Sequence, residues 1–97
     1  MAKGYWVAFY RSISNPAAMA AYAKLAKPAI EAGGGRFLTR GTAVKAYEAG
    51  IVERSVLIEF DSVQQAIATY ESPAYQAAKK LLEGGAVERD VRFLEGD

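Results

Sequence analysis

The sequence predicts an α+β domain whose elements follow the order β-α-β-β-α-β, and three observations lead to this prediction. Four short segments are rich in aromatic and β-branched residues, as strands are. Two longer segments place apolar residues at helical spacing, each after a residue that caps helices well. Glycine runs follow both helical segments. The length of 97 residues fits one domain, 1–97.

The first strand is expected near residues 4–11, where Gly-Tyr-Trp-Val-Ala-Phe-Tyr-Arg favours a pleated strand. The first helix is expected near 16–32, because Asn15 can cap its free amides and Pro16 suits the first helical position. The glycine run 33–35 then ends this helix. A phosphate-binding loop would precede a helix rather than follow one, so the run is interpreted as a helix stop.

The second and third strands are expected near residues 36–48 and 52–60, with a turn at Ala49-Gly50 between them. Within the longer of the two, Gly41 is expected to mark a β-bulge, because an isolated glycine in a strand often does.

The second helix is expected near residues 62–82, and it begins with the capping-box spacing of Ser62 and Gln65. The fourth strand is expected near 88–94. This order of elements is the split βαβ, or ferredoxin-like, arrangement. It predicts a four-stranded antiparallel sheet with two helices on one face.

A proline divides the second helix. Because proline cannot continue a helix, Ser72-Pro73 is expected to stop one helical segment and to cap the next. The change of direction is expected to swing Tyr75 toward the sheet.

Both faces of the predicted strands are apolar. In the first strand, Trp6 and Tyr10 point to one side while Tyr5 and Phe9 point to the other. A sheet face in water alternates apolar with polar residues, and the helices cover only one face. We therefore expect the face away from the helices to form a homodimer interface or a ligand pocket. The alternative is that these aromatics are scattered surface residues.

The composition excludes several classes of protein. The chain has neither Cys nor His, which excludes a disulfide framework, a thiolate nucleophile, an imidazole base and the usual transition-metal and haem ligands. No metal and no cofactor are therefore expected. The formal charge of +1, without a basic run, argues against a nucleic-acid partner. No apolar stretch is long enough to span a membrane, and no secretion signal is recognisable, so a cytoplasmic location is expected.

Glu59 is the first candidate for a catalytic residue, because it lies in an otherwise apolar strand. In a protein without His, a carboxylate in an apolar cleft could carry general acid–base chemistry. The alternative is a structural ion pair with Arg40, Arg92 or an arginine of a partner subunit.

Arg36 and Arg40 are four residues apart on a predicted strand, which places both on the same face. A guanidinium is the usual donor to a carboxylate or an enolate, and Arg40 is the better candidate for this role. Solvated arginines on an edge strand are the alternative. Trp6, Tyr10 and Tyr47 are candidates for the walls of the cleft, although subunit packing explains Trp6 and Tyr10 equally well.

Taken together, the motifs of the chain resemble domain-of-unknown-function family 1330, and the resemblance covers nearly the whole chain. The blocks that carry it are Lys3-Gly-Tyr-Trp-Val-Ala, Asn15-Pro16, Gly34-Gly-Arg-Phe-Leu-Thr-Arg-Gly41, Val56-Leu-Ile-Glu-Phe-Asp-Ser62 and Glu71-Ser-Pro-Ala-Tyr-Gln76. The resemblance implies a dimeric α+β barrel, in which two ferredoxin-like sheets pack face to face around a cleft. It implies no activity.

Two hypotheses about function follow. In the first, a homodimer holds a small organic acid or aromatic ligand in the cleft and catalyses cofactor-independent proton transfer, as isomerase-like or monooxygenase-like proteins do. Glu59 is then the acid or base, Arg40 and Arg36 bind the anion, and the aromatic residues form the walls. In the second, the protein is a non-catalytic ligand-binding or structural, stress-response dimer whose charges only pair across the interface.

Overall fold

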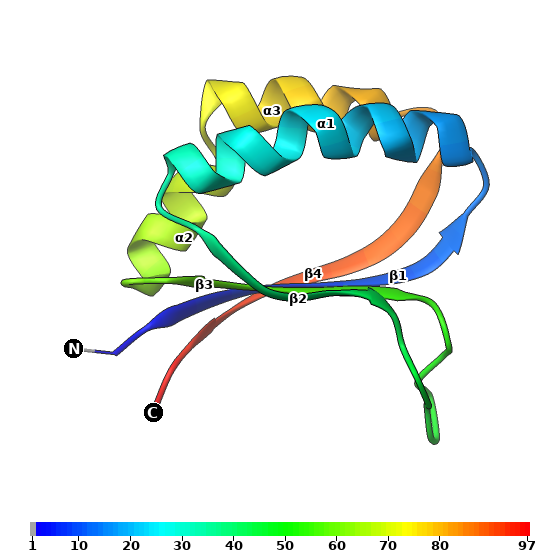
Figure 1. The fold of residues 1–97 in the computed structure, drawn as a ribbon, viewed down its shortest axis with the longest axis horizontal. Helices are drawn as coiled ribbons and strands as arrows, with labels where there is room; N and C mark the ends of the chain where they lie inside the picture. Colours follow the sequence, from blue (N-terminus) through cyan, green and yellow to red (C-terminus); the bar gives the residue numbers. More distant parts are fainter. Residues whose placement is uncertain (1) are drawn as a thin grey trace.

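The structure is a computed structural model that describes residues 2–97, and it has the predicted ferredoxin-like fold (Figure 1). Four strands form one antiparallel sheet in the order β2-β3-β1-β4. The helices lie together over one face of this sheet, and the other face is left open. The strands are β1 (Gly4–Ile13), β2 (Arg36–Thr42), β3 (Arg54–Phe60) and β4 (Val87–Glu95). The helical elements are α1 (Pro16–Ala32), α2 (Val63–Tyr70), α3 (Pro73–Lys79) and the 3₁₀ turn η1 (Lys80–Leu82).

Helix α1 has the predicted bounds. The side chain of Asn15 accepts a hydrogen bond from the amide of Ala18 at 3.1 Å, and Pro16 occupies the first turn. The buried face of α1 contains Met19, Tyr22, Ala26 and Ile30. No helix of residues 2–97 has the length and apolar character that crossing a bilayer requires.

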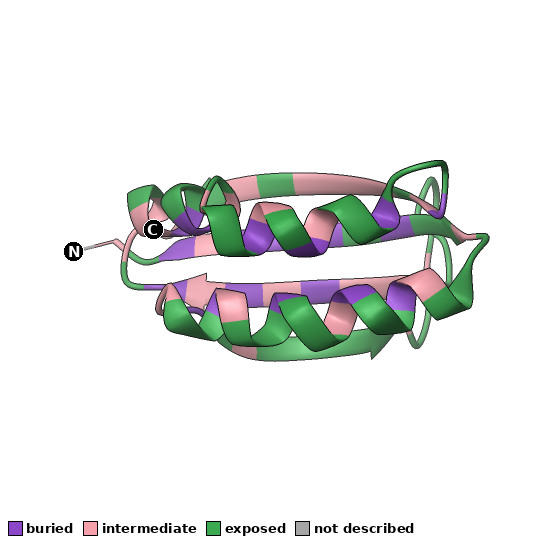
Figure 2. Ribbon diagram, turned by 90° about the horizontal axis from the view of Figure 1, so that it is seen from above, coloured by how far each residue is buried: buried purple, intermediate pink, exposed green. Residues whose placement is uncertain are grey.

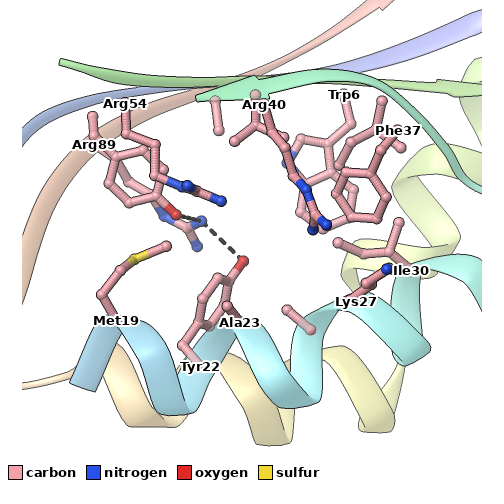
Figure 3. Close-up of a pocket in the computed structure, with 15 residues that line it drawn as sticks. Trp6, Met19, Tyr22, Ala23, Lys27, Ile30, Phe37, Arg40, Arg54 and Arg89 are labelled. Carbon is pink, nitrogen blue, oxygen red and sulfur yellow. Dashed lines mark hydrogen bonds between the residues drawn. The ribbon is translucent and has the colours of Figure 1, made fainter. Parts of the chain in front are cut away.

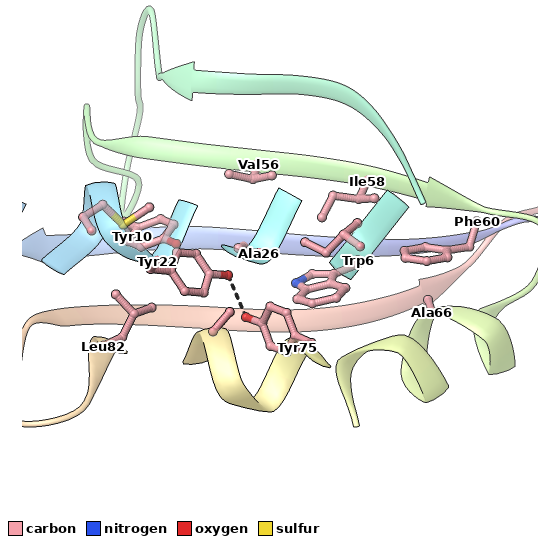
Figure 4. Packing of buried hydrophobic residues seen from close by; sticks show 14 residues of the cluster. Trp6, Tyr10, Tyr22, Ala26, Val56, Ile58, Phe60, Ala66, Tyr75 and Leu82 are labelled. Atoms are coloured by element: carbon pink, nitrogen blue, oxygen red, sulfur yellow. Dashed lines mark hydrogen bonds between the residues drawn. The ribbon is translucent and has the colours of Figure 1, made fainter. Parts of the chain in front are cut away.

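The predicted break in the second helical region is confirmed. The Oγ of Ser72 accepts the amide hydrogen of Tyr75 at 3.3 Å, which caps α3 where α2 has ended. Tyr75 is fully buried, and its ring packs edge-on against Trp6 with centroids 4.7 Å apart. Trp6, Phe60 and Tyr75 form the centre of the core between the sheet and the helices (Figure 4).

Strand β2 is shorter than expected, because it ends at Thr42 rather than near residue 48. Thr42 pairs with Arg54, the first residue of β3, so the chain beyond it has no neighbouring strand. Residues 43–53 instead form a loop that projects from the end of the sheet on the side opposite the helices (Figure 1). Tyr47, which was expected in a strand beside a cleft, lies in this loop and is 72% exposed.

A register shift divides β2 near Leu38. Phe37 pairs with Ile58 and Thr39 pairs with Leu57, so Leu38 is an extra residue without a partner. The bulge is therefore at Leu38 and not at Gly41. One additional residue reverses the face of every residue after it, which makes the expectation that Arg36 and Arg40 share a face wrong.

The two faces of β1 are now assigned. Trp6 and Tyr10 point beneath the helices and are 1% and 3% exposed, whereas Phe9 on the open face is 48% exposed. A view from above shows the buried residues concentrated on the inner strands and on the inner sides of the helices (Figure 2). The expectation that Trp6 and Tyr10 share a cleft with Glu59 is therefore wrong, because Glu59 lies on the open face beside Tyr5.

Candidate functional site

A small cavity lies between α1 and the sheet, and several basic residues are among those that line it (Figure 3). Its volume is about 30 Å³. The close-up shows Arg54 and Arg89 at one end, with Arg40 and Lys27 toward the other. The aromatic and apolar residues of its lining include Trp6, Tyr10, Met19, Tyr22, Phe37 and Ile58.

The register of the sheet produces the basic end of the cavity. Arg89 of β4 lies directly opposite Tyr10 of β1. On the other side of β1, Phe9 pairs with Ser55, so Tyr10 and Arg54 are the next residues along that ladder. The three side chains therefore form one row across the helix-covered face, with a phenol between two guanidinium groups.

The next row of the sheet leaves space because its central side chain is small. Ala8 of β1 lies between Val56 of β3 and Val91 of β4. Opposite this row, α1 contributes Ala23 and Ala26 to the lining of the cavity. Small residues on both sides keep α1 from filling the gap, and the cavity is the result.

The row beyond it is bulky and apolar, and it closes the cavity at the opposite end. Trp6 pairs with Ile58 on one side and with Phe93 on the other, and Ile58 also pairs with Phe37 of β2. The cavity thus has a cationic end, a floor of small side chains and an aromatic end.

Arg89 is held by three phenols. Its Nη1 donates to the hydroxyl of Tyr10 at 3.3 Å and to that of Tyr22 at 3.2 Å, and its Nη2 donates to Tyr75 at 2.8 Å. The hydroxyls of Tyr22 and Tyr75 are themselves 2.7 Å apart. Burial raises the pKa of all three tyrosines, so they are neutral hydrogen-bonding groups near neutral pH.

The positive charge in the cavity has no carboxylate partner among residues 2–97. The ion pairs that these residues form involve Lys3, Arg36 and Arg92, and none involves a cation of the cavity. The Nε of Arg54 is buried and has no hydrogen-bond partner. Arg40 lies over the ring of Phe37, 4.8 Å from its centroid. A buried polar nitrogen normally has a hydrogen-bond partner, so the Nε of Arg54 is a donor that an anion in the cavity could satisfy.

Glu59 and Arg40 are not brought together, because they lie on opposite faces of the sheet. The Oε1 of Glu59 accepts from the Nε of Arg36 at 3.2 Å and lies 3.1 Å from its Nη2. Tyr5 donates to the other carboxylate oxygen at 3.5 Å. Glu59 is therefore ion-paired, and its partner is Arg36 rather than Arg40 or Arg92. Arg92 pairs with Asp90 at 2.9 Å.

Arg54 and Arg89 were not among the residues expected at the site. A signal for Arg54 exists in the sequence, because it keeps the two-residue period of Val56, Ile58 and Phe60, which the helices cover. A basic residue that keeps the same two-residue period as these buried residues has its side chain on the helix-covered face. Arg89 stands in the same phase as its neighbours Val91 and Phe93 of β4.

A second hollow, of about 390 Å³, lies on the open face beneath the 43–53 loop. Phe9, Ile51 and Arg92 are among the residues that line it. It is larger than the cavity under α1, but the cations that line it, Arg11, Lys45 and Arg92, are all exposed, and Arg92 is paired with Asp90. We place the candidate site under α1, where cations without a carboxylate partner converge.

Comparison with known proteins supports the fold. The profile of a family described as "Domain of unknown function (DUF1330)" matches residues 3–97. A protein of unknown function from Rhodopseudomonas palustris superposes with a TM-score of 0.73 at 18% identity, over 96% of this chain and 81% of that one. No curated protein sequence matches the chain.

Two further structures share the fold. A dimeric ferredoxin-like protein of unknown function from Thermobifida fusca has a TM-score of 0.66 at 15% identity, covering 96% of this chain and 90% of that one. A protein from Nitrosomonas europaea, named as a candidate antibiotic biosynthesis monooxygenase, has a TM-score of 0.60 at 16% identity. That match covers 99% of this chain and 98% of the other.

Proposed function

Because this chain belongs to DUF1330, a family described only as a domain of unknown function, we propose its function from the cavity itself: the protein binds a small organic acid between α1 and the sheet. The observation that carries this proposal is the pair Arg54 and Arg89, two inward-pointing cations without a carboxylate partner among residues 2–97. A bound carboxylate or enolate would accept hydrogen bonds from both guanidinium groups, including the unpaired Nε of Arg54.

The rest of the lining suits the carbon skeleton of such an acid. With its charged group at Arg54, the apolar part would lie over Ala8 and extend toward Trp6 and Phe37. Ligand sites commonly combine an apolar wall with a few converging polar groups. A flat aromatic or unsaturated acid matches this arrangement best, since aromatic rings line the far end.

Binding requires the mouth of the cavity to widen. A volume of about 30 Å³ holds about one water molecule, which is too little for an organic acid. The side chains of Lys27 and Arg40 are the flexible part of the lining, because both residues are exposed. An outward rotation of these two side chains would enlarge the cavity without moving α1.

The cavity supports anion binding more directly than proton abstraction. Its described lining contains no carboxylate, and Tyr22 has a raised pKa because of burial, so its phenol is a donor rather than a base. Together with Arg89, this phenol would stabilise an enolate oxygen by hydrogen bonding. Cofactor-independent proton transfer in this cavity is the second candidate: Tyr22 would give its proton to the carbon of a bound enolate, and the resulting phenolate, beside Arg89, would take a proton back from water. The role of Glu59 as acid or base remains a prediction.

We also propose that the protein is a homodimer through the open face of the sheet. Phe9 and Leu94 are about half exposed there, at 48% and 52%, and they flank the apolar residues Val7 and Leu57. A chain of this size gains stability from the additional burial. The Thermobifida fusca protein that shares the fold is described as dimeric, which supports dimer formation but does not identify the face.

Isothermal titration calorimetry with benzoate and its neutral analogue benzamide tests the binding proposal. Benzoate is expected to bind and benzamide to bind at least about tenfold more weakly, because only the carboxylate pairs with the cations. Arg54→Gln is expected to weaken benzoate binding by a similar factor. Arg11→Gln removes the same charge at an exposed position outside this cavity and is the matched control. Equal binding of the two compounds, or an unchanged affinity in Arg54→Gln, would contradict the proposal.

A further inference from the structure

The cations of the cavity fall into two groups at separate places. Arg54 and Arg89 stand in one row of the sheet beside the phenols, and both are partly buried. Arg40 and Lys27 lie toward the other end, where both are exposed at the mouth (Figure 3). We call Arg54 and Arg89 the inner group, and Arg40 and Lys27 the outer group. A single carboxylate bound to the inner group would leave the outer group without an anionic partner.

The register gives the separation of the two groups. Arg40 pairs with Val56, and Arg54 is two residues before Val56 on the same strand. Arg40 and Arg54 are therefore diagonal neighbours on one face, about 7–8 Å apart. Long guanidinium side chains that start this far apart can each bind a different anionic group of one small molecule.

The outer group is available for such a contact. Arg40 makes no ion pair with residues 2–97, and its guanidinium lies over the ring of Phe37 at the edge of the cavity. Lys27 reaches the same region from α1, so the two cations approach the mouth from the sheet and from the helix. The bulge at Leu38 is what turns Arg40 to this face.

We infer that the ligand is a dianion, a small dicarboxylic acid or an acid with a second anionic oxygen at its far end. This inference rests on the proposed binding function and adds a second charge to the ligand. The inner carboxylate would pair with Arg54 and Arg89, the carbon skeleton would lie over Ala8, and the outer anionic group would pair with Arg40 and Lys27. Closure of these two side chains over the bound molecule would exclude water from the cavity.

Calorimetry with two matched pairs of acids tests the second charge. Terephthalate is compared with benzoate, and adipate with hexanoate, so that a misfit of the rigid ring does not decide the result alone. At least one dianion is expected to bind about tenfold or more tightly than its monoanion, and its affinity is expected to fall more steeply with salt.

Substitutions at the mouth of the cavity test whether Arg40 and Lys27 cause the preference for the dianion. Arg40→Gln and Lys27→Gln are each expected to remove most of the preference for the dianion, because each weakens dianion binding more than monoanion binding. Lys24→Gln, an exposed lysine on the same helix outside the cavity, is the matched control and is expected to keep the preference.

The outcomes separate this inference from the proposed function. If the monoanions bind and neither dianion binds more tightly, the dianion inference is wrong and the single-anion site stands. If the preference is present but survives in both Arg40→Gln and Lys27→Gln, the outer group is not its source and the inference is also wrong. If none of the four acids binds, both the inference and the proposed function fail.

Discussion

The hydroxyl oxygens of Tyr22 and Tyr75 are 2.7 Å apart, and the hydrogen bond between them joins α1 to α3 above the sheet. Arg89 of β4 donates to both, so three elements meet at one buried polar cluster next to the cavity. The inner wall of the candidate site and the packing of the helices therefore depend on the same side chains. Substitutions in this cluster are expected to affect folding as well as binding.

Tyr75→Ala is expected to lower the free energy of unfolding by about 2–4 kcal/mol, because it empties a fully buried aromatic position. Tyr75→Phe keeps the ring but leaves Arg89 and Tyr22 each with one hydrogen-bond partner fewer, so a loss of about 1.5–3 kcal/mol is expected. Urea denaturation measures both. Tyr47→Ala, at an exposed position in the 43–53 loop, is the control and is expected to change stability by less than about 0.5 kcal/mol. A similar small change in Tyr75→Ala would contradict the assigned packing.

The protein is expected to lose stability above about pH 10. Burial raises the pKa of Tyr10, Tyr22 and Tyr75, whereas the unfolded chain ionises its tyrosines near pH 10. The stabilisation is therefore fully present below about pH 10 and is lost as the pH rises through the higher pKa values of the folded state. Denaturant midpoints across this range measure the effect, with tyrosinate absorbance recorded alongside.

Tyr22→Phe is expected to make that decline shallower, since it removes one of the buried phenols. Tyr47→Phe removes a phenol that is exposed in the folded protein and is expected to leave the slope unchanged. The same slope in both variants would show that the buried phenols are not its cause.

Phe9→Glu is expected to convert the proposed dimer to a 10.4 kDa monomer, because it places a further charge beside Asp90 on the open face of the sheet. Sedimentation equilibrium at micromolar concentration measures the mass. Leu25→Glu changes a residue of equal exposure, 50%, on the outside of α1 and is expected to leave the assembly unchanged. A monomeric parent protein would refute the interface directly.

Glu59→Gln is expected to weaken the proposed dimer without abolishing the proposed binding of organic acids, because Glu59 pairs with Arg36 on the open face and does not line the cavity. A double-mutant cycle with Arg36→Gln, read out as the dimer dissociation constant, measures their coupling. Additive effects of the two substitutions would argue against a structural pair. Loss of acid binding in Glu59→Gln would make Glu59 a candidate again for the acid or base in proton transfer.

Gly4→Ala is expected to destabilise the protein by about 1–3 kcal/mol. An added Cβ at Gly4 would meet backbone atoms of Ser62 and Val63 where β1 passes the start of α2, and backbone gives way less easily than a flexible side chain. Gly50→Ala, in the exposed loop with its nearest neighbouring atom at 3.1 Å, is the milder comparison. Thermal denaturation of the two variants tests the difference.

Local signals in the sequence predicted the helices well. Asn15 and Pro16 set the start of α1 because capping and proline geometry are local properties of the chain. The stop before Pro73 is equally local, since proline lacks the amide that would continue the helix. These elements need no knowledge of distant partners, and their bounds agree with the prediction to within a residue or two.

Features that depend on neighbouring strands were not predictable. Val44 and Tyr47 have good strand propensity, but β3 begins too late to pair with them, so they form a loop. Both sides of β1 are apolar, so the pattern alone does not tell which side Trp6 and Tyr10 occupy. The site was predicted on the wrong face of the sheet for this reason. The bulge at Leu38 also contributed, because no residue in this part of the sequence indicates it.

The bulge at Leu38 also affects how this chain is to be aligned with its relatives. A relative with a straight second strand has one residue fewer between the positions of Gly35 and Gly41. A gapless alignment through this strand would match Arg40 with a residue on the opposite face, and a cation at the candidate cavity would be compared with a residue on the open face of the sheet. A gap placed opposite Leu38 restores the correspondence, because the residues on either side of it keep their partners in β3.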